Sequence, residues 1–400
     1  MSNITNFNKI KEAEALHYMP VFSRNNLALE YGKGNCVYDI NGNKYVDFVA
    51  GIATNILGYD HPEYTHAVCD QVHKLMHVSN HYYTAVQSEY LTALCNASGL
   101  SRVFLCNSGA EANECAIKLA RRYFKNNGGP KRILTSSGAF HGRTIATLTA
   151  TDNSNQHRVY SPLPDGFDSF EYNDFDDFKS KLTDDVGAVF LETIQGERGV
   201  RPFSNDFIVN AYALCKSKGV LFIVDEIQTG MGRTGKLFSY EHFGIKPDIV
   251  TLAKGIAGGI PMGACLASEE VGTAFALGDH GSTFGGNALA CAAANKVLDI
   301  LLDGLLDSSA EVGKYFGERL AHFSKYHFIT DIRGIGLMRG IQLDDKVPAA
   351  AFEGKLKERG YLVNVAGNNT LRLIPPLTIT AEEIDGLIDA LDDICASTNV

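Results

Sequence analysis

The chain has 400 residues, of which 45% are hydrophobic and 20% charged, and such a composition is typical of a globular protein large enough for two domains. Its net charge of −10 argues against nucleic acid or an anionic membrane as a partner, because both bind basic surfaces. The polar N-terminus has no signal-peptide core, and no apolar run approaches the roughly 20 residues of a membrane helix. Nine scattered cysteines without a C-x-x-C pair favour reduced thiols in a cytoplasmic protein.

Three zones follow one another along the chain. Residues 1–59 include a β-hairpin, predicted by two strand-like runs around Asn41-Gly42. In residues 60–286 short apolar runs alternate with amphipathic helices, which predicts an α/β domain whose large, mainly parallel sheet is covered on both faces. Residues 287–400 start with a long helix and read as part of a smaller α+β domain. Because ligands bind where parallel strands end, the chemistry is expected at those strand ends.

A strand that stops at Cys106 is followed by Asn107, Ser108, Gly109 and Ala110, which open a helix. Free N–H groups and the positive end of the helix suit a phosphate, and the hydroxyl of Ser108 adds a donor. A serine-capped helix without a ligand explains the same pattern.

A glycine-rich turn places Phe140 and Arg143 close together. The ring of Phe140 could form an apolar platform, and Arg143 could bind a carboxylate through two hydrogen bonds. A core phenylalanine and a surface arginine are the alternative.

A third apolar strand ends in Asp225-Glu226, and a buried carboxylate at that place needs a partner. The segment 230–235 matches G-x-G-x-x-G, which raises the alternative of an NAD-dependent dehydrogenase. The match does not follow its strand directly, and carboxylates at the strand end would repel a pyrophosphate. The dinucleotide interpretation is therefore disfavoured.

Lys254 stands in an apolar, glycine-rich stretch just after the next strand, 29 residues beyond Asp225. A lysine is rarely buried without a partner, but as an imine with an aldehyde cofactor it buries far less charge. An aspartate that faces the far end of this cofactor could hold its pyridinium proton. The pair is typical of pyridoxal phosphate, although a structural Lys–Asp ion pair remains the alternative.

A metal site is a further alternative. Cys69, His73 and His77 are predicted at helical spacing on one face, but the segment lacks H-E-x-x-H, and a half-exposed helix rich in histidine explains it better. No metal is expected.

The chain resembles the class III pyridoxal-phosphate aminotransferases of fold type I over nearly its whole length. Eight motifs occur in the family's order, namely GIATNILGYDHP, FLCNSGAEANE, FHGRT, ETIQGERGV, DEIQTGMGRTG, TLAKGIAGGIPMGA, GSTFGGNALA and LRLIPPLTIT. The resemblance implies a fold type I transferase with a large sheet domain, and a small domain built from both termini.

The resemblance also implies roles for single residues. Lys254 would be the Schiff-base lysine and Asp225 the partner of the pyridine nitrogen, so both are the expected catalytic residues. The other expected cofactor-binding residues are Ser108, Gly109, Ala110, Phe140, Gln228 and Thr283, with Thr283 reaching the phosphate of a neighbouring subunit in a homodimer with shared active sites. The expected substrate-binding residues are Arg143, Arg372, Ser282 and Glu197, which would mask Arg372.

The resemblance further implies a ping-pong exchange between N-acetylornithine and 2-oxoglutarate that belongs to arginine biosynthesis. N-succinylornithine, succinyldiaminopimelate, ornithine and 4-aminobutyrate remain alternative amino donors. The chain departs from the family's pattern at Thr193, where the family usually has a proline, and at Arg198, where it usually has a small residue; Arg201 is a second arginine nearby. The two arginines have two interpretations. They are solvated arginines, or they place a cation near the acyl end of the substrate and favour the succinyl donor.

Overall fold

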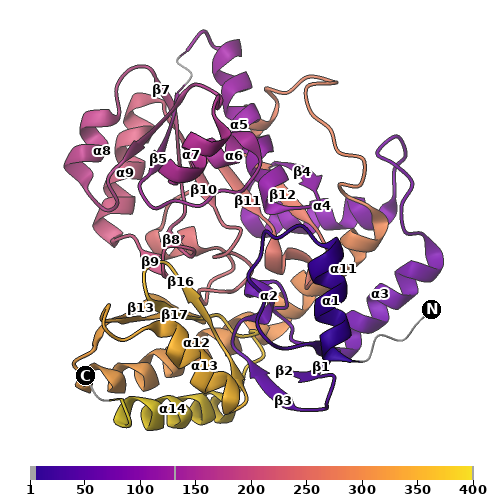
Figure 1. Ribbon diagram of the computed structural model, residues 1–400. Helices are drawn as coiled ribbons and strands as arrows, with labels where there is room; N and C mark the ends of the chain where they lie inside the picture. Colours follow the sequence, from indigo (N-terminus) through magenta and orange to yellow (C-terminus); the bar gives the residue numbers. More distant parts are fainter. Residues whose placement is uncertain (1–5, 130–131, 399–400) are drawn as a thin grey trace.

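The computed structural model describes residues 6–129 and 132–398. Its central feature is a seven-stranded sheet in the order β4-β12-β11-β10-β7-β5-β6, shown in the upper half of Figure 1. Six strands run parallel and β12 runs antiparallel to both of its neighbours. The predicted mainly parallel sheet is thus confirmed. The strands are β4 Arg102–Cys106, β5 Arg132–Ser136, β6 Phe167–Phe170, β7 Val186–Leu191, β10 Leu221–Asp225, β11 Ile249–Leu252 and β12 Gly263–Ala267.

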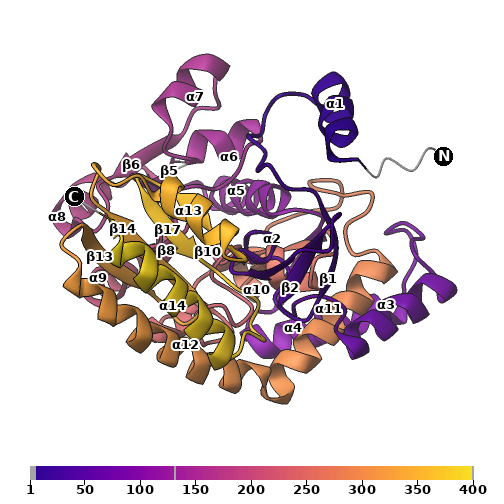
Figure 2. The ribbon, with the colours of Figure 1, turned by 60° about the horizontal axis from the view of Figure 1, so that its bottom comes forward.

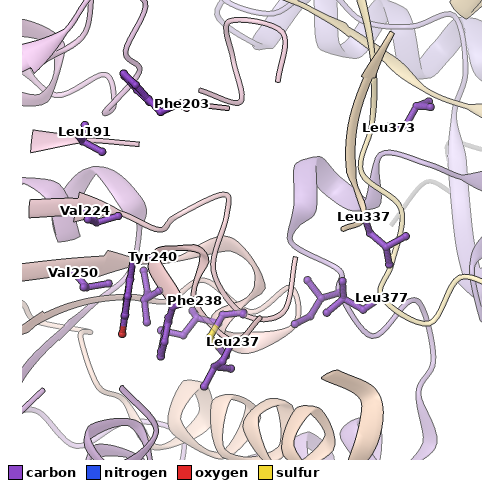
Figure 3. Packing of buried hydrophobic residues seen from close by; sticks show 14 of the residues in the cluster. Leu191, Phe203, Val224, Leu237, Phe238, Tyr240, Val250, Leu337, Leu373 and Leu377 are labelled. Atoms are coloured by element: carbon purple, nitrogen blue, oxygen red, sulfur yellow. The ribbon is translucent and has the colours of Figure 1, made fainter. Parts of the chain in front are cut away.

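Helices cover both faces of this sheet because neighbouring residues of a strand point to opposite faces. In β10, Ile223 packs against α5 (Gly109–Asn126), whereas Phe222 and Val224 face the other side, in one cluster with residues of α9 (Asn205–Lys218). Figure 3 shows the second cluster extending from Leu191 and Val250 of the sheet to Leu337 and Leu373 of the C-terminal region. A continuous core therefore joins the two regions.

Two smaller sheets and a ribbon complete the strands. The hairpin predicted around Asn41-Gly42 is formed by β2 and β3, and Asp39 stabilises its turn by accepting hydrogen bonds from the N–H groups of Asn41 and Asn43. The sheet β1-β2-β3-β15 combines strands from both ends of the chain, and the sheet β13-β14-β17-β16 lies below the large sheet in Figure 1. These strands are β1 Leu29–Lys33, β2 Cys36–Asp39, β3 Lys44–Asp47, β8 Ile194–Gln195, β9 Arg201–Pro202, β13 Ile329–Ile335, β14 Met338–Leu343, β15 Tyr361–Leu362, β16 Asn364–Ala366 and β17 Thr370–Leu373.

The long helix predicted after Asn287 starts there, because the Asn287 side chain accepts a hydrogen bond from Ala290 N. A π-helical turn over Leu301–Leu305, where Gly304 has φ +111°, separates α11 (Ala288–Ile300) from α12 (Leu306–Ala321). Figure 2 shows α11 and α12 following one another along one edge, with α14 beside α12. The remaining helices are α1 Phe7–His17, α2 Ala50–Ala53, α3 Pro62–Lys74, α4 Ala85–Ser98, α6 Ile145–Ala150, α7 Ser154–Tyr160, α8 Phe175–Lys181, α10 Glu269–Gly272, α11 Ala288–Ile300, α12 Leu306–Ala321, α13 Ala349–Glu358 and α14 Ala381–Ala396.

None of the helices in the described ranges is long and apolar enough to cross a membrane. The domain boundaries expected after residues 59 and 286 stay a prediction.

Candidate active site

A cavity of about 460 Å³ lies where β4, β10 and β11 end, at the sheet edge expected to carry the chemistry. The structure brings most of the predicted residues together there. Those that line the cavity are Ser108, Gly109, Ala110, Phe140, Arg143, Glu197, Asp225, Gln228 and Lys254.

Lys254 follows β11 and starts a short 3₁₀ helix, Lys254–Ala257. Its φ of +49° is uncommon for a residue with a side chain, so the surrounding fold fixes an unfavourable backbone conformation here. Burial lowers the pKa of its ammonium group, and the nearby charge of Glu197 opposes this shift. The shift makes the neutral amine, which is the nucleophilic and basic form, more accessible than in an exposed lysine.

Asp225 ends β10 and is held by three donors. Nδ2 of Asn113 and Nδ1 of His141 each lie 2.8 Å from Oδ2, and the N–H of Ile227 donates to Oδ1 at 3.0 Å. The ring of His141 stacks on Phe190 with the ring centroids 4.0 Å apart. The carboxylate is therefore fixed in both position and orientation.

Two of these donors, Asn113 and His141, were absent from the predicted site. Both stand inside motifs that the sequence already presented, FLCNSGAEANE and FHGRT. Their burial with Asp225 depends on the packing of α5 and of the loop after β5 against β10, which no local pattern reports.

Ser108 is the N-cap of α5, and its Oγ accepts a hydrogen bond from Glu111 N at 3.2 Å. The capped helix considered from the sequence is thus present. Gly109 and Ala110, as the first residues of the helix, have no preceding turn to bond their N–H groups. A Cβ at Gly109 would lie 2.8 Å from Cδ1 of Ile227, so the helix start approaches the loop after β10 closely.

Glu192 is a second buried carboxyl group that the sequence did not single out. Its Oε1 accepts a hydrogen bond from Phe140 N at 2.8 Å, and its Oε2 accepts one from Gly196 N at 3.2 Å. Burial raises its pKa to about 8, and the neighbouring charge of Asp225 acts in the same direction. Glu192 therefore joins the loop of Phe140 to the loop of Glu197.

Glu197 and Arg372 form an ion pair beside the cavity, with Oε1 2.6 Å from Nη1. Arg372 is 1% exposed, and Nε2 of Gln228 donates a further hydrogen bond to Glu197 at 3.0 Å. Burial alone would raise the pKa of Glu197, but the charge of Arg372 lowers it below its usual value. Arg143, by contrast, is exposed, and its guanidinium carbon lies 5.5 Å from the centroid of the Phe140 ring.

Comparisons with known proteins agree with this geometry. A family model described as aminotransferase class-III matches residues 18–395. An acetylornithine aminotransferase of Methanocaldococcus jannaschii is 43% identical over 387 residues, which are 96% of this chain and 97% of that protein. The chain belongs to the class-III aminotransferases.

Solved structures of the family share the fold. An ornithine aminotransferase of Toxoplasma gondii superimposes with a TM-score of 0.94 at 33% identity, covering 98% of this chain and 95% of that one. An acetylornithine aminotransferase of Elizabethkingia anophelis has a TM-score of 0.89 at 33% identity, covering 98% and 100%. The predicted fold type I transferase architecture is confirmed.

The cofactor of this class-III aminotransferase is pyridoxal phosphate, and the cavity fits it. The amine of Lys254 suits an aldehyde, the fixed carboxylate of Asp225 suits a pyridine nitrogen, and the free N–H groups at the start of α5 suit a phosphate. The residues present in the cavity therefore fit each of the three parts of the cofactor.

Two residues predicted to bind substrate or cofactor, Ser282 and Thr283, do not line the Lys254 cavity of their own chain. Ser282 and Thr283 line a separate cavity of about 640 Å³, together with Asn80 and His81. Oγ of Ser282 accepts hydrogen bonds from Nδ2 of Asn107 at 3.1 Å and from Gly285 N at 3.0 Å. Within one chain, therefore, neither residue lines the cavity of Lys254, and Ser282 is linked to it through Asn107, which does line that cavity.

The two unusual arginines also lie outside the Lys254 cavity. Arg198 and Arg201 line a third cavity, of about 480 Å³, formed with residues of the C-terminal sheet. Neither arginine lines the cavity of Lys254, and a contact of Arg198 with the acyl end of the substrate stays a prediction.

The metal alternative has no geometric basis in the described chain. Cys69 and His73 lie on α3, but the helix ends at Lys74, before His77. The described ranges hold no cluster of metal-ligating side chains.

Proposed function

We propose that the protein transfers the terminal amine of N-acetyl-L-ornithine to 2-oxoglutarate, giving N-acetyl-L-glutamate 5-semialdehyde and L-glutamate. The observation that carries the proposal is the masked pair Glu197–Arg372 beside the cavity of Lys254. The acetylornithine aminotransferases at 40–45% identity support the choice of donor.

Several residues would hold the cofactor. The amine of Lys254 would bond its aldehyde, Asp225 would face the pyridine nitrogen, and the start of α5 would receive the phosphate. Phe140 would lie against the ring, and Gln228 near the phenolic oxygen. When bound, pyridoxal phosphate withdraws electrons from the substrate carbon that loses its proton.

Nζ of Lys254 moves the proton of that substrate carbon. A general base works best when its pKa lies near the working pH, and burial shifts this lysine in that direction. Lys254 lines the cavity from a fixed backbone position, so the same amine can remove the proton and return it nearby.

Two different substrates must fit one site in the two half-reactions. Arg143 binds the α-carboxylate of N-acetylornithine, while Glu197 neutralises Arg372 and prevents it from competing for this group. In the second half-reaction 2-oxoglutarate brings two carboxylates, so Arg143 binds the distal one and Arg372 exchanges Glu197 for the other. A buried cation with a movable partner thus never stands unpaired.

The proposed enzyme is a homodimer with shared active sites. Thr283 lines a cavity other than that of its own Lys254, which is consistent with a role at the site of the neighbouring copy. All nine cysteines are free, as expected for a cytoplasmic enzyme of arginine biosynthesis.

The test is a comparison of amino donors with the purified holoenzyme and 2-oxoglutarate as acceptor. We expect the highest kcat/KM for N-acetylornithine, above those for N-succinylornithine, ornithine, succinyldiaminopimelate and 4-aminobutyrate. Parallel lines in double-reciprocal plots would establish the ping-pong order. If kcat/KM were higher for ornithine, the proposal would be wrong and ornithine would be the amino donor. Ornithine is the substrate named for the Toxoplasma gondii structure.

A further inference from the structure

The third cavity, of about 480 Å³, lies between the β8–β9 ribbon and the C-terminal sheet. Figure 1 shows β8 and β9 beside β13 and β16 at this junction. Its volume is in the range of small-molecule sites. The residues that line it are Tyr172, Arg198, Arg201, Pro202, Asp331, Arg333, Gln342 and Asn368.

The cavity is lined by three arginines, Arg198, Arg201 and Arg333, and by a single carboxylate, that of Asp331. Asp331 is paired with Arg333, with Oδ2 2.8 Å from Nη1. In the described part of the chain, neither Arg198 nor Arg201 forms an ion pair with a carboxylate. The cavity thus has a net charge of +2 in a protein whose net charge is −10.

The arginines are held in place by the fold. Nε of Arg333 donates to the carbonyl oxygens of Gly199 and Val200 at 2.9 and 3.0 Å. The guanidinium carbon of Arg201 lies 3.8 Å from the centroid of the Tyr172 ring. Such contacts lower the entropy that a bound ligand would have to overcome.

Arg198 packs against the loop after β5. A Cβ at Gly138 would lie 3.2 Å from Cγ of Arg198, so the arginine stem packs against the bare glycine backbone. Arg198 as a whole is an exposed residue. A long charged side chain can pack along its stem while its charged end meets a ligand.

We propose that this cavity binds a small anion with two negative charges, carried by a phosphate or by a pair of carboxylates. Guanidinium groups bind both kinds of oxyanion through paired hydrogen bonds. The site is separate from the Lys254 cavity, and the proposal does not depend on the identity of the amino donor.

The test is isothermal titration of the holoenzyme with inorganic phosphate and, separately, with succinate, at constant ionic strength set with chloride. The loaded cofactor prevents phosphate from entering the cofactor's own phosphate site. We expect binding of at least one anion, and the one that binds identifies phosphate or carboxylate as the ligand group. In the Arg198→Gln/Arg201→Gln variant the affinity of the third cavity should fall about tenfold or more.

Two further variants separate binding from general effects of charge. Arg359→Gln removes an exposed arginine on another part of the surface and should leave the affinity unchanged. Arg201→Lys keeps the charge but loses the planar fork, so it should weaken binding, though less than the double glutamine variant does. The melting temperature of each variant reports whether it is folded.

The proposal is overturned if the holoenzyme binds neither anion at up to about 10 mM, a concentration about tenfold above a weak Kd of about 1 mM. It is also overturned if the double glutamine variant binds both anions as tightly as the wild type. Succinate could also bind at Arg143 in the Lys254 cavity, but that binding would persist in the double variant.

Discussion

Oε1 of Glu197 lies 2.6 Å from Nη1 of Arg372, and this short ion pair joins the loop after β8 to β17 of the C-terminal sheet. Gln228 connects to both partners, because its Nε2 donates to Glu197 and its Oε1 accepts from Arg372 at 3.2 Å. Removal of one partner of a buried pair leaves an uncompensated charge, which costs about 3–5 kcal/mol.

Glu197→Ala should therefore change how the enzyme discriminates between its substrates. Arg372, now unmasked, gains more from binding a carboxylate, so KM for 2-oxoglutarate should fall. It also competes with Arg143 for the carboxylate of the amino donor, so kcat/KM for N-acetylornithine should fall about tenfold. Steady-state kinetics of both half-reactions measure this, with Glu318→Ala as an exposed control. Equal changes for both substrates would contradict the masking role.

Lys254→Ala should abolish proton transfer. A positioned general base contributes about 10²–10⁴-fold, and the variant also loses the amine that bonds the cofactor, so kcat should fall by at least about 10³-fold. The visible absorption of the protein should change as well. Lys355→Ala, on the exposed side of α13, should retain both activity and spectrum. Retention of near-normal turnover by Lys254→Ala would remove this lysine from the mechanism.

Asn113→Ala should destabilise the protein through Asp225. The variant loses the 2.8 Å hydrogen bond to a buried carboxylate, and a hydrogen bond to a charged group is worth about 1.5–3 kcal/mol. The free energy of unfolding in urea should fall by this amount, whereas Asn127→Ala at the exposed end of α5 should cost less. If the free energy of unfolding fell equally in both variants, the hydrogen bond to Asp225 would contribute no more to stability than an exposed one.

Glu192 predicts a pH dependence of stability. Its folded pKa of about 8 is above that of an unfolded glutamate, so the folded state binds the extra proton and stability is lost as the pH rises toward and through 8. Glu192→Gln carries no such charge. The melting temperature of the variant relative to wild type should therefore rise between about pH 5 and pH 8 and level off above it, while Glu318→Gln should show no such trend. A difference that stays constant over this range would refute the prediction.

Much of the fold and part of the site follow from local patterns. The turn residues Asn41-Gly42 predicted their hairpin, and the rule that parallel strands end at one edge brought Asp225 and Lys254 together. The reversed direction of β12, placed between β4 and β11, has no local signal because it depends on strand pairing across the sheet.

The missing parts of the site depend on long-range packing. Asn113 and His141 meet at Asp225 only after three separate segments have docked. Arg198 follows Glu197 directly in the sequence, yet the two side chains line different cavities. A shift of one residue along the backbone is enough to change the cavity that a side chain lines. Motif position alone does not carry such information.

The pairing of β15 with β3 sets an order of events during synthesis. β3 ends at Asp47, and its parallel partner begins only at Tyr361, so the ribosome must complete the whole large sheet before this strand edge can be covered. Until then the edge of β3 is open to pairing with other chains. The nascent protein is therefore most vulnerable to aggregation at its first sheet, and that sheet closes only when translation is nearly over.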